Sequence, residues 1–155
     1  MEFIRAPKEA GCFLCRIIRD GPGKDDENLV IHRGGTCLLM MNRYPYNGGH
    51  LMVAPYRHEG SLEALGAEER REMLDLACLA ERLLARVARP DGFNLGINQG
   101  SAAGAGAKDH LHLHVVPRWE GDTNFMPVLG SVRVMPQALE EMHAALRAAR
   151  AQEGL

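Results

Sequence analysis

Short apolar runs separated by turn-forming residues divide the chain into a series of predicted strands. The runs have the length of strands rather than of helices. Glycine, proline, asparagine and aspartate stand between them and favour turns. One run, 36–41, is almost continuously apolar, which is typical of a strand buried on both faces. The predicted strands cover 29–32, 36–41, 50–54, 93–97, 110–115 and 128–134.

Two further segments show the period of an amphipathic helix. Within 61–88, apolar residues recur at i, i+3 and i+4 spacing, and Pro90-Asp91-Gly92 ends the pattern. A second stripe follows Pro136, a residue that suits the first turn of a helix. Together the patterns predict an α+β fold with a mostly antiparallel sheet, one long helix and a C-terminal helix. The apolar positions are Met73, Leu76, Ala77, Ala80, Leu83, Leu84 and Val87, then Leu139, Met142, Leu146 and Ala149.

Length and composition fit one globular domain over 1–155. A chain of 155 residues buries an adequate core, and 46% apolar with 25% charged residues is ordinary. The formal net charge of −2 provides no broad basic field, so we expect neither nucleic acid nor an anionic membrane as partner. No run approaches the roughly 20 apolar residues of a membrane span. The start, Met1 to Lys8, lacks the apolar core of a signal peptide, and we expect a cytoplasmic protein.

Three histidines alternate with apolar residues in Asp109-His110-Leu111-His112-Leu113-His114-Val115-Val116-Pro117-Arg118. In an extended chain, successive side chains point to opposite faces. The three imidazoles therefore share one face, and the leucines share the other with Val115. Because histidine changes charge near neutral pH, such a row suits nucleophilic or acid–base chemistry. An exposed polar edge strand and adventitious metal affinity remain the alternatives.

The four cysteines raise the question of metal binding. In a cytoplasmic protein they are reduced, which favours a metal site over disulfides. The spacing in Cys12-Phe13-Leu14-Cys15 lets two thiolates meet one tetrahedral ion, although it supplies only two of four ligands. A redox pair or two packing cysteines are the alternatives. Cys37 and Cys78, inside a predicted strand and the long helix, are assigned to packing.

Two polar segments are candidates for ligand contacts. The segment 98–108 is rich in glycine and alanine, whose small side chains let backbone N–H groups approach and hold an anion. A plain surface loop is the alternative. The segment 42–49 forms an ordered bend, in which Asn42 either serves a ligand or bonds its own turn. His50, which follows it, either faces the histidine row or is a satisfied core histidine.

The histidine segment resembles the signature of the histidine triad family of nucleotide hydrolases and transferases. Further segments agree: Asn98-Gln99-Gly100 with Gly104-Ala105-Gly106-Ala107 lies where the family has its phosphate-holding loop, and Asn42 to Val53 resembles its nucleoside-side segment. Trp119 and Gly121 to Phe125 are similar to the branch that includes diadenosine tetraphosphate phosphorylases. The resemblance covers about residues 10–128, the core of a single such domain, with a C-terminal strand and helix over 129–150.

The resemblance implies a five-stranded sheet per subunit, a homodimer that joins two sheets, and transfer of a nucleoside monophosphate to water or phosphate. The substrate would be a purine nucleotide, which in this branch is a dinucleoside polyphosphate. The implied catalytic residues are His112, which attacks the α-phosphorus to give a nucleotidyl-histidine, His114, which bonds phosphate oxygens, and His50 as a further contact. The implied substrate-binding residues are Asn42 at the ribose, and Asn98, Gly104, Ala105, Gly106 and Ala107 at the α-phosphate.

The resemblance also implies a metal site. Zinc-binding members complete the cysteine pair with the first histidine of the triad and with a histidine that follows the preceding strand. Those positions are His110 and His58, with His50 as the substitute for His58. A shell of Cys12, Cys15, His58 and His110 would be closed, which predicts a structural zinc, and no catalytic metal is expected.

Function therefore stays open between three readings at this point. The first is the nucleotidyl hydrolase or phosphorylase. The second is a nucleotide-binding module with structural zinc and little turnover. The third is a nucleotidyltransferase like the galactose-1-phosphate uridylyltransferase relatives, which have glutamine at the position of His114.

Overall fold

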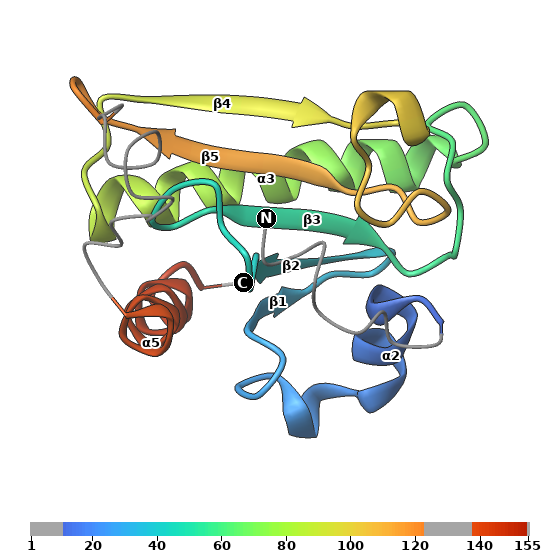
Figure 1. The fold of residues 1–155 in the computed structure, drawn as a ribbon. Coiled ribbons are helices and arrows are strands. Elements are labelled where there is room, and N and C mark those ends of the chain that lie inside the picture. The colour runs from blue at the N-terminus through green and yellow to red at the C-terminus, as the bar shows by residue number, and fades with distance from the viewer. Residues whose placement is uncertain (1–10, 123–137, 155) are drawn as a thin grey trace.

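A computed structural model of the chain describes residues 11–122 and 138–154. Five strands form one antiparallel sheet in the order β1-β2-β3-β5-β4 (Figure 1). The predicted late strand, 128–134, and Pro136 lie outside the described residues. The strands are β1 (Val30–Arg33), β2 (Cys37–Met41), β3 (Leu51–Pro55), β4 (Gly92–Ile97) and β5 (Leu113–Arg118); the helices are α2 (Phe13–Asp20), α3 (Ala67–Val87) and α5 (Leu139–Ala151).

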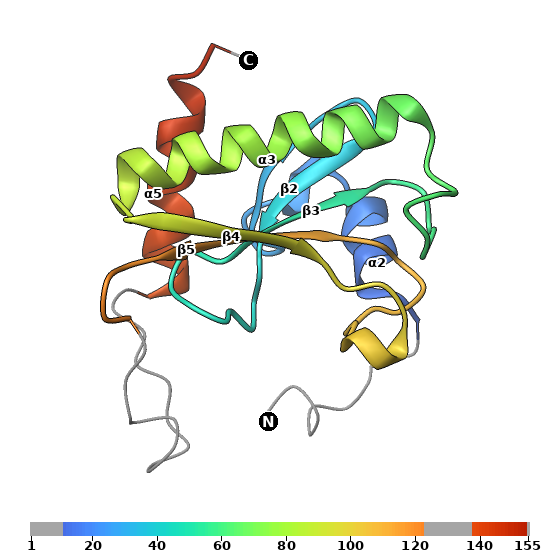
Figure 2. The ribbon, with the colours of Figure 1, turned by 90° about the horizontal axis from the view of Figure 1, so that it is seen from above.

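The two faces of the sheet pack against different helices. α3 runs along one face, and α2 lies on the other side (Figure 2). Along β2, the side chains of Leu39 and Met41 belong to the core under α3, whereas Leu38 and Met40 belong to the core with α2. β2 is therefore buried on both faces, as its apolar run predicted. Cys37 is part of the α3 core, and burial raises the pKa of its thiol to about 11, which confirms a packing role.

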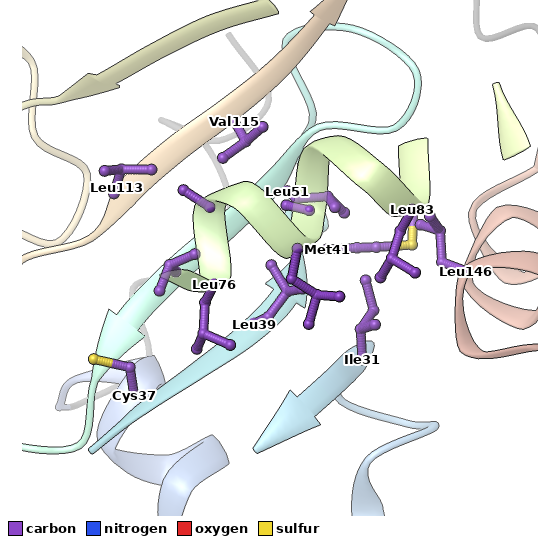
Figure 3. Close-up of a cluster of buried hydrophobic side chains, with 14 of the residues drawn as sticks. Ile31, Cys37, Leu39, Met41, Leu51, Leu76, Leu83, Leu113, Val115 and Leu146 are labelled. Carbon is purple, nitrogen blue, oxygen red and sulfur yellow. The ribbon is translucent and has the colours of Figure 1, made fainter. Parts of the chain in front are cut away.

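The long helix presents the predicted apolar stripe to the sheet. Leu76 and Leu83 of α3 meet Leu39 and Leu51 of the strands, with Leu146 of α5 beside them (Figure 3). Burial of such side chains provides about 1.5–3 kcal/mol each and holds the layers together. α3 starts later than predicted, at Ala67, because the Glu69 carboxylate accepts the N–H of Gly66 and caps the helix there.

Three details differ from the expectations. The segment Phe13–Asp20, which was not predicted as a helix, forms α2. Cys78 is exposed on α3, so its assignment to packing was wrong. β5 begins only at Leu113, so both other histidines precede it: His110 lies in a bend and His112 in irregular chain. The N–H of Leu111 bonds Glu59 O instead of a partner in the strand ladder.

The C-terminal helix carries its predicted stripe into the same core. Met142, Leu146 and Ala149 are buried under α3 and β1, and Leu139 packs at the edge. Polar contacts fix it further: Nε2 of His143 donates to Val30 O at 3.0 Å, and Arg150 bonds Nδ1 of His32. No helix among residues 11–122 and 138–154 combines the length and the apolar character that a bilayer crossing requires.

Candidate active site and metal centre

His112 is held in one tautomer by the chain that carries it. Its Nδ1 lies 2.9 Å from the carbonyl oxygen of His110, and a carbonyl only accepts hydrogen bonds. Nδ1 of the neutral ring therefore bears the hydrogen, and Nε2 bears an unprotonated lone pair. The ring is buried and lies 4.8 Å from the ring of His114, centroid to centroid. This arrangement gives His112 the lone pair of a nucleophile in a fixed direction.

A second chain of hydrogen bonds fixes His50 and His114. The N–H of Tyr46 donates to Nδ1 of His50 at 3.1 Å, so that nitrogen is an acceptor. Nε2 of the neutral His50 ring then carries the hydrogen and donates it to Nδ1 of His114 at 2.9 Å. The remaining nitrogen of His114, Nε2, is left as a donor. His50 is thus both a fully buried, satisfied histidine and a residue that faces the triad, so the two alternatives coincide.

Burial keeps these rings neutral. The pKa of His112 lies below its usual range because burial disfavours the imidazolium, against the opposing effect of the His110 carbonyl. Burial and the nearby ring of His112 lower the pKa of His114 to about 4. At neutral pH both imidazoles are therefore uncharged, one offering a lone pair and the other a hydrogen-bond donor.

Asn42 makes the local contacts that the sequence left open. Its Oδ1 accepts the N–H of Tyr44 at 2.9 Å, and its Nδ2 lies 3.3 Å from Nδ1 of His50. The side chain thus bonds its own turn and supports His50. A ribose contact at Asn42 stays a prediction.

Asn98 and the small-residue loop are placed by the sheet. Ile97, the last residue of β4, pairs with Leu113, the first residue of β5, so Asn98 and His112 both adjoin this end of the ladder. The loop that follows joins the ends of β4 and β5 and contains Gly104 in a left-handed conformation, φ 79°. Over 104–107, exposed residues alternate with half-buried ones. Its role as a phosphate cradle stays a prediction.

The four predicted metal ligands converge at the other end of the histidine segment. Sγ of Cys12 lies 3.2 Å from Nδ1 of His110, and Sγ of Cys15 lies 3.2 Å from Nδ1 of His58. All four ligand atoms lie within 4.8 Å of one another, an arrangement suited to one metal ion. Nε2 of His110 donates to Pro55 O at 2.8 Å, which turns Nδ1 toward the thiols. His50, the proposed substitute ligand, lies against His114 and is not part of this group.

The two fixed imidazoles lie beside a Cys₂His₂ cluster, and comparison with known proteins identifies the family. Residues 24–121 match the model of the HIT domain. The chain belongs to the HIT family.

Curated relatives of this HIT protein include a phosphorylase and an adenylylsulfatase. It is 47% identical to an AP-4-A phosphorylase of Mycobacterium tuberculosis over 117 residues, which are 76% of this chain and 60% of the relative. It is 30% identical to adenylylsulfatase HINT3 of Arabidopsis thaliana, over 72% of this chain and 54% of that protein. The chain therefore spans a little over half the length of these two relatives.

Solved structures share the fold, and one of them is Zn-bound. A Zn-bound histidine triad family protein from Mycobacterium smegmatis matches with a TM-score of 0.73 and 29% identity, covering 93% of this chain and 96% of that one. A uridylyltransferase structure matches with a TM-score of 0.70 at 18% identity, over 94% of this chain and 46% of the other, which shows a shared fold.

Two features of this HIT site were not predicted from the sequence. The ring of Tyr46 stacks on His50, with centroids 4.6 Å apart, and leans against His114 at 5.6 Å. Asp122 joins β5 to the bend over 42–49, since it accepts hydrogen bonds from Arg118 and from Nδ2 of Asn47. The only sequence signal was the pair of tyrosines flanking Pro45, which does not reveal that Tyr46 contacts His114, 68 residues away.

Proposed function

We propose that this HIT protein cleaves a dinucleoside polyphosphate at an α-phosphate through a nucleotidyl-histidine intermediate. The observation that carries the proposal is the pair of fixed tautomers: a lone pair on Nε2 of His112 next to a donor on Nε2 of His114. The identity of 47% to an AP-4-A phosphorylase supports this substrate class over other nucleotides.

In the first step, the lone pair of His112 Nε2 forms a bond to the α-phosphorus. The bond from that phosphorus to the bridging oxygen breaks, and its electron pair leaves with the polyphosphate as an anion. The imidazole becomes positively charged, and the His110 carbonyl, which accepts the hydrogen of Nδ1, stabilises that charge. The Nε2–H of His114 bonds the phosphate oxygens on which negative charge develops.

In the second step, water or orthophosphate attacks the same phosphorus. The phosphorus–nitrogen bond breaks and returns its electron pair to Nε2 of His112. Water gives the nucleoside monophosphate and releases a proton, whereas orthophosphate gives the nucleoside diphosphate. Splitting the transfer in two in this way replaces one difficult displacement by two easier ones.

The remaining substrate contacts follow the resemblance. Asn98 and the amides of the segment 104–107 would hold the α-phosphate, because they lie at the end of the sheet where His112 is found. Asn42 would contact the ribose of the same nucleotide, since it lies beside His50 at the end of β2. With these contacts, the first nucleoside would lie on the β2 side of the triad.

The Cys₂His₂ group fits a structural zinc. Two zinc ligands at about 2.3 Å for sulfur and 2.0 Å for nitrogen lie about 3.5 Å apart in a tetrahedron. The observed sulfur–nitrogen distances of 3.2 and 3.5 Å agree. Four protein ligands leave no open position, so the ion would tie α2 to the segment that carries His112 rather than take part in the reaction. Reduced thiols of this kind are consistent with a cytoplasmic protein.

We also propose a homodimer formed along β4. Among the described strands, β4 is at one edge of the sheet, and it is the longer of the two edge strands. Leu95 in its middle is 46% exposed. An unpaired edge with an exposed leucine is a template for pairing with a second strand. Light scattering on the purified protein would give the mass of two chains.

Product analysis tests the proposed activity. The protein is incubated with diadenosine tetraphosphate, with and without orthophosphate, and the nucleotides are separated. ADP that forms only with orthophosphate indicates a phosphorylase, and AMP formed in water indicates a hydrolase. Binding without either product would leave a nucleotide-binding module, and His112→Ala serves as the inactive control.

A further inference from the structure

A cavity lies beyond His114 on the same face of the sheet. It has a volume of about 340 Å³ and is lined by Tyr46, Asn47, Asn94, Val116, Arg118 and Asp122. Its size is within the range of small-molecule sites. Along β5 its lining residues Val116 and Arg118 alternate in step with His114, and Asn94 of β4 pairs with Val116. The cavity therefore adjoins His114 along β5 and β4, and the bend over 42–49 covers it through Tyr46, whose ring lies 5.6 Å from that of His114.

The chemistry of this cavity favours an uncharged, planar group. The guanidinium of Arg118 is matched by the Asp122 carboxylate through bonds of 2.6 and 2.7 Å, so the cavity has no unbalanced positive charge for a phosphate. Val116 forms an apolar part of the wall. The Tyr46 ring stacks on His50 and is 55% exposed, so it offers aromatic surface to a ligand.

Asn94 adds a specific polar contact. Its Oδ1 accepts a hydrogen bond from Arg118 at 2.8 Å, which fixes the orientation of the amide. The Nδ2 group is then a donor at the rim of the cavity. An aromatic face, an oriented amide and an apolar wall together are what a nucleobase with ring nitrogen acceptors requires.

We infer that this cavity binds the second nucleoside of the dinucleoside polyphosphate, the one that leaves with the polyphosphate. The inference rests on the proposed function, which places the first nucleoside at Asn42 on the β2 side. Val116 is about 7 Å and Arg118 about 13 Å from His114 along the strand. A polyphosphate bridge that starts at the triad covers such a span, so the second base reaches the cavity while the α-phosphate stays at His112.

The test compares two substrates in matched variants. Diadenosine tetraphosphate carries the second nucleoside, whereas the p-nitrophenyl ester of AMP offers the same α-phosphate without it. Asn94→Leu removes the donor at nearly constant volume, and Val116→Phe fills the cavity. Leu74→Asn changes an exposed side chain of α3, away from both the cavity and the β4 edge, and serves as the control. Light scattering verifies that all variants keep the oligomeric state of the wild type.

We expect Asn94→Leu and Val116→Phe to lower kcat/KM for diadenosine tetraphosphate at least tenfold and to leave the ester within twofold of wild type. An equal loss on both substrates, or a loss on neither, would overturn the subsite. A wild-type protein that turns over neither substrate would instead refute the proposed activity. In that case binding measurements decide. The subsite still requires that Asn94→Leu lowers the affinity for diadenosine tetraphosphate at least tenfold and leaves the affinity for AMP unchanged. Unchanged affinity for both ligands would overturn the subsite.

Discussion

Nε2 of His50 and Nδ1 of His114 lie 2.9 Å apart inside the protein, and this contact determines which nitrogen of His114 faces the substrate. His50 is fully buried, and its other nitrogen accepts the N–H of Tyr46. The direction of every hydrogen bond in this chain follows from one backbone donor. The site therefore favours a neutral imidazole at His114, because protonation of its Nδ1 would direct a second hydrogen at the N–H of His50.

The first prediction concerns the pH dependence of stability. The pKa of His114 is about 4 in the folded protein, because burial and the His112 ring lower it from 6.5. Between these values the unfolded chain binds the proton and the folded chain does not. Stability contributed by the neutral ring is therefore complete above pH 6.5 and is lost as pH falls toward 4, by up to about 3 kcal/mol.

Urea unfolding of the wild type and of His114→Asn at a series of pH values measures this difference. The two free energies of unfolding should converge as pH falls from 6.5 to 4, since only the wild type loses the contribution of His114. Parallel curves over this window would show that His114 titrates normally in the folded protein.

The second prediction concerns the nucleophile. His112→Ala should lower turnover of diadenosine tetraphosphate by a factor on the order of 10³ or more, because no other lone pair is fixed beside the donor of His114 among the described residues. Nucleotide affinity should stay within about tenfold, which corresponds to 1.4 kcal/mol. His32→Gln, at an imidazole on β1 outside the site, is the control and should keep full turnover. Residual activity above about a tenth of wild type would remove His112 from the nucleophilic role.

The intermediate can also be trapped. Rapid quench of wild-type protein with substrate labelled at the α-phosphorus should leave an acid-labile, base-stable label, as expected for a phosphoramidate on histidine. The His112→Ala variant should carry none. Turnover of the wild type without any label would indicate direct attack by water.

Periodicity predicted the main elements of the fold, because burial acts on side chains at fixed spacing. The stripe from Met73 to Leu84 and the two-sided burial of 36–41 are of this kind. α2 was missed because its eight residues are short and are followed by Gly21-Pro22-Gly23, which favours a loop. The start of β5 at Leu113 was missed because it depends on a bond from Leu111 to Glu59, a partner that no local pattern reveals.

The functional site also has parts that the sequence predicted and parts that it did not. Alternation placed the three histidines near one another, and the Cys12–Cys15 spacing suggested a metal. The partners that fix each imidazole are distant in sequence, such as His50 for His114 and Pro55 for His110. Contacts of this kind follow from the sheet register, so resemblance was needed to find His58, and the structure was needed to find Tyr46.

The third prediction concerns a carboxylate that anchors the hairpin between β1 and β2. Glu72 of α3 accepts the N–H groups of Gly35, Thr36 and Cys37, and the hydroxyl of Thr36. Burial opposes ionisation, but these donors hold the pKa of Glu72 below its usual value. Glu72→Ala would leave several donors without a partner and should lower the free energy of unfolding by about 2–4 kcal/mol.

Denaturant unfolding measures the effect, with Asp75→Ala as the matched control on the exposed side of the same helix. The control should change stability by no more than about 0.5 kcal/mol. A similar small value for Glu72→Ala would show that water replaces the carboxylate without cost.

The fourth prediction concerns the metal. Protein purified without chelator should contain about one zinc ion per chain, because two sulfurs and two nitrogens form a complete tetrahedral shell. Replacing both thiols, Cys12→Ser with Cys15→Ser, should abolish zinc binding and lower Tm by on the order of 10 °C. The physical reason is that the ion links α2 to His110, and the scattered ligands of the unfolded chain bind it far less well.

Cys78→Ser, at an exposed thiol on α3, is the control and should keep both zinc and Tm. Turnover in the double variant should fall only as far as the His110 carbonyl, which orients His112, is displaced. Zinc-free protein with unchanged Tm would return Cys12 and Cys15 to packing, and it would free His110 to act directly on the substrate.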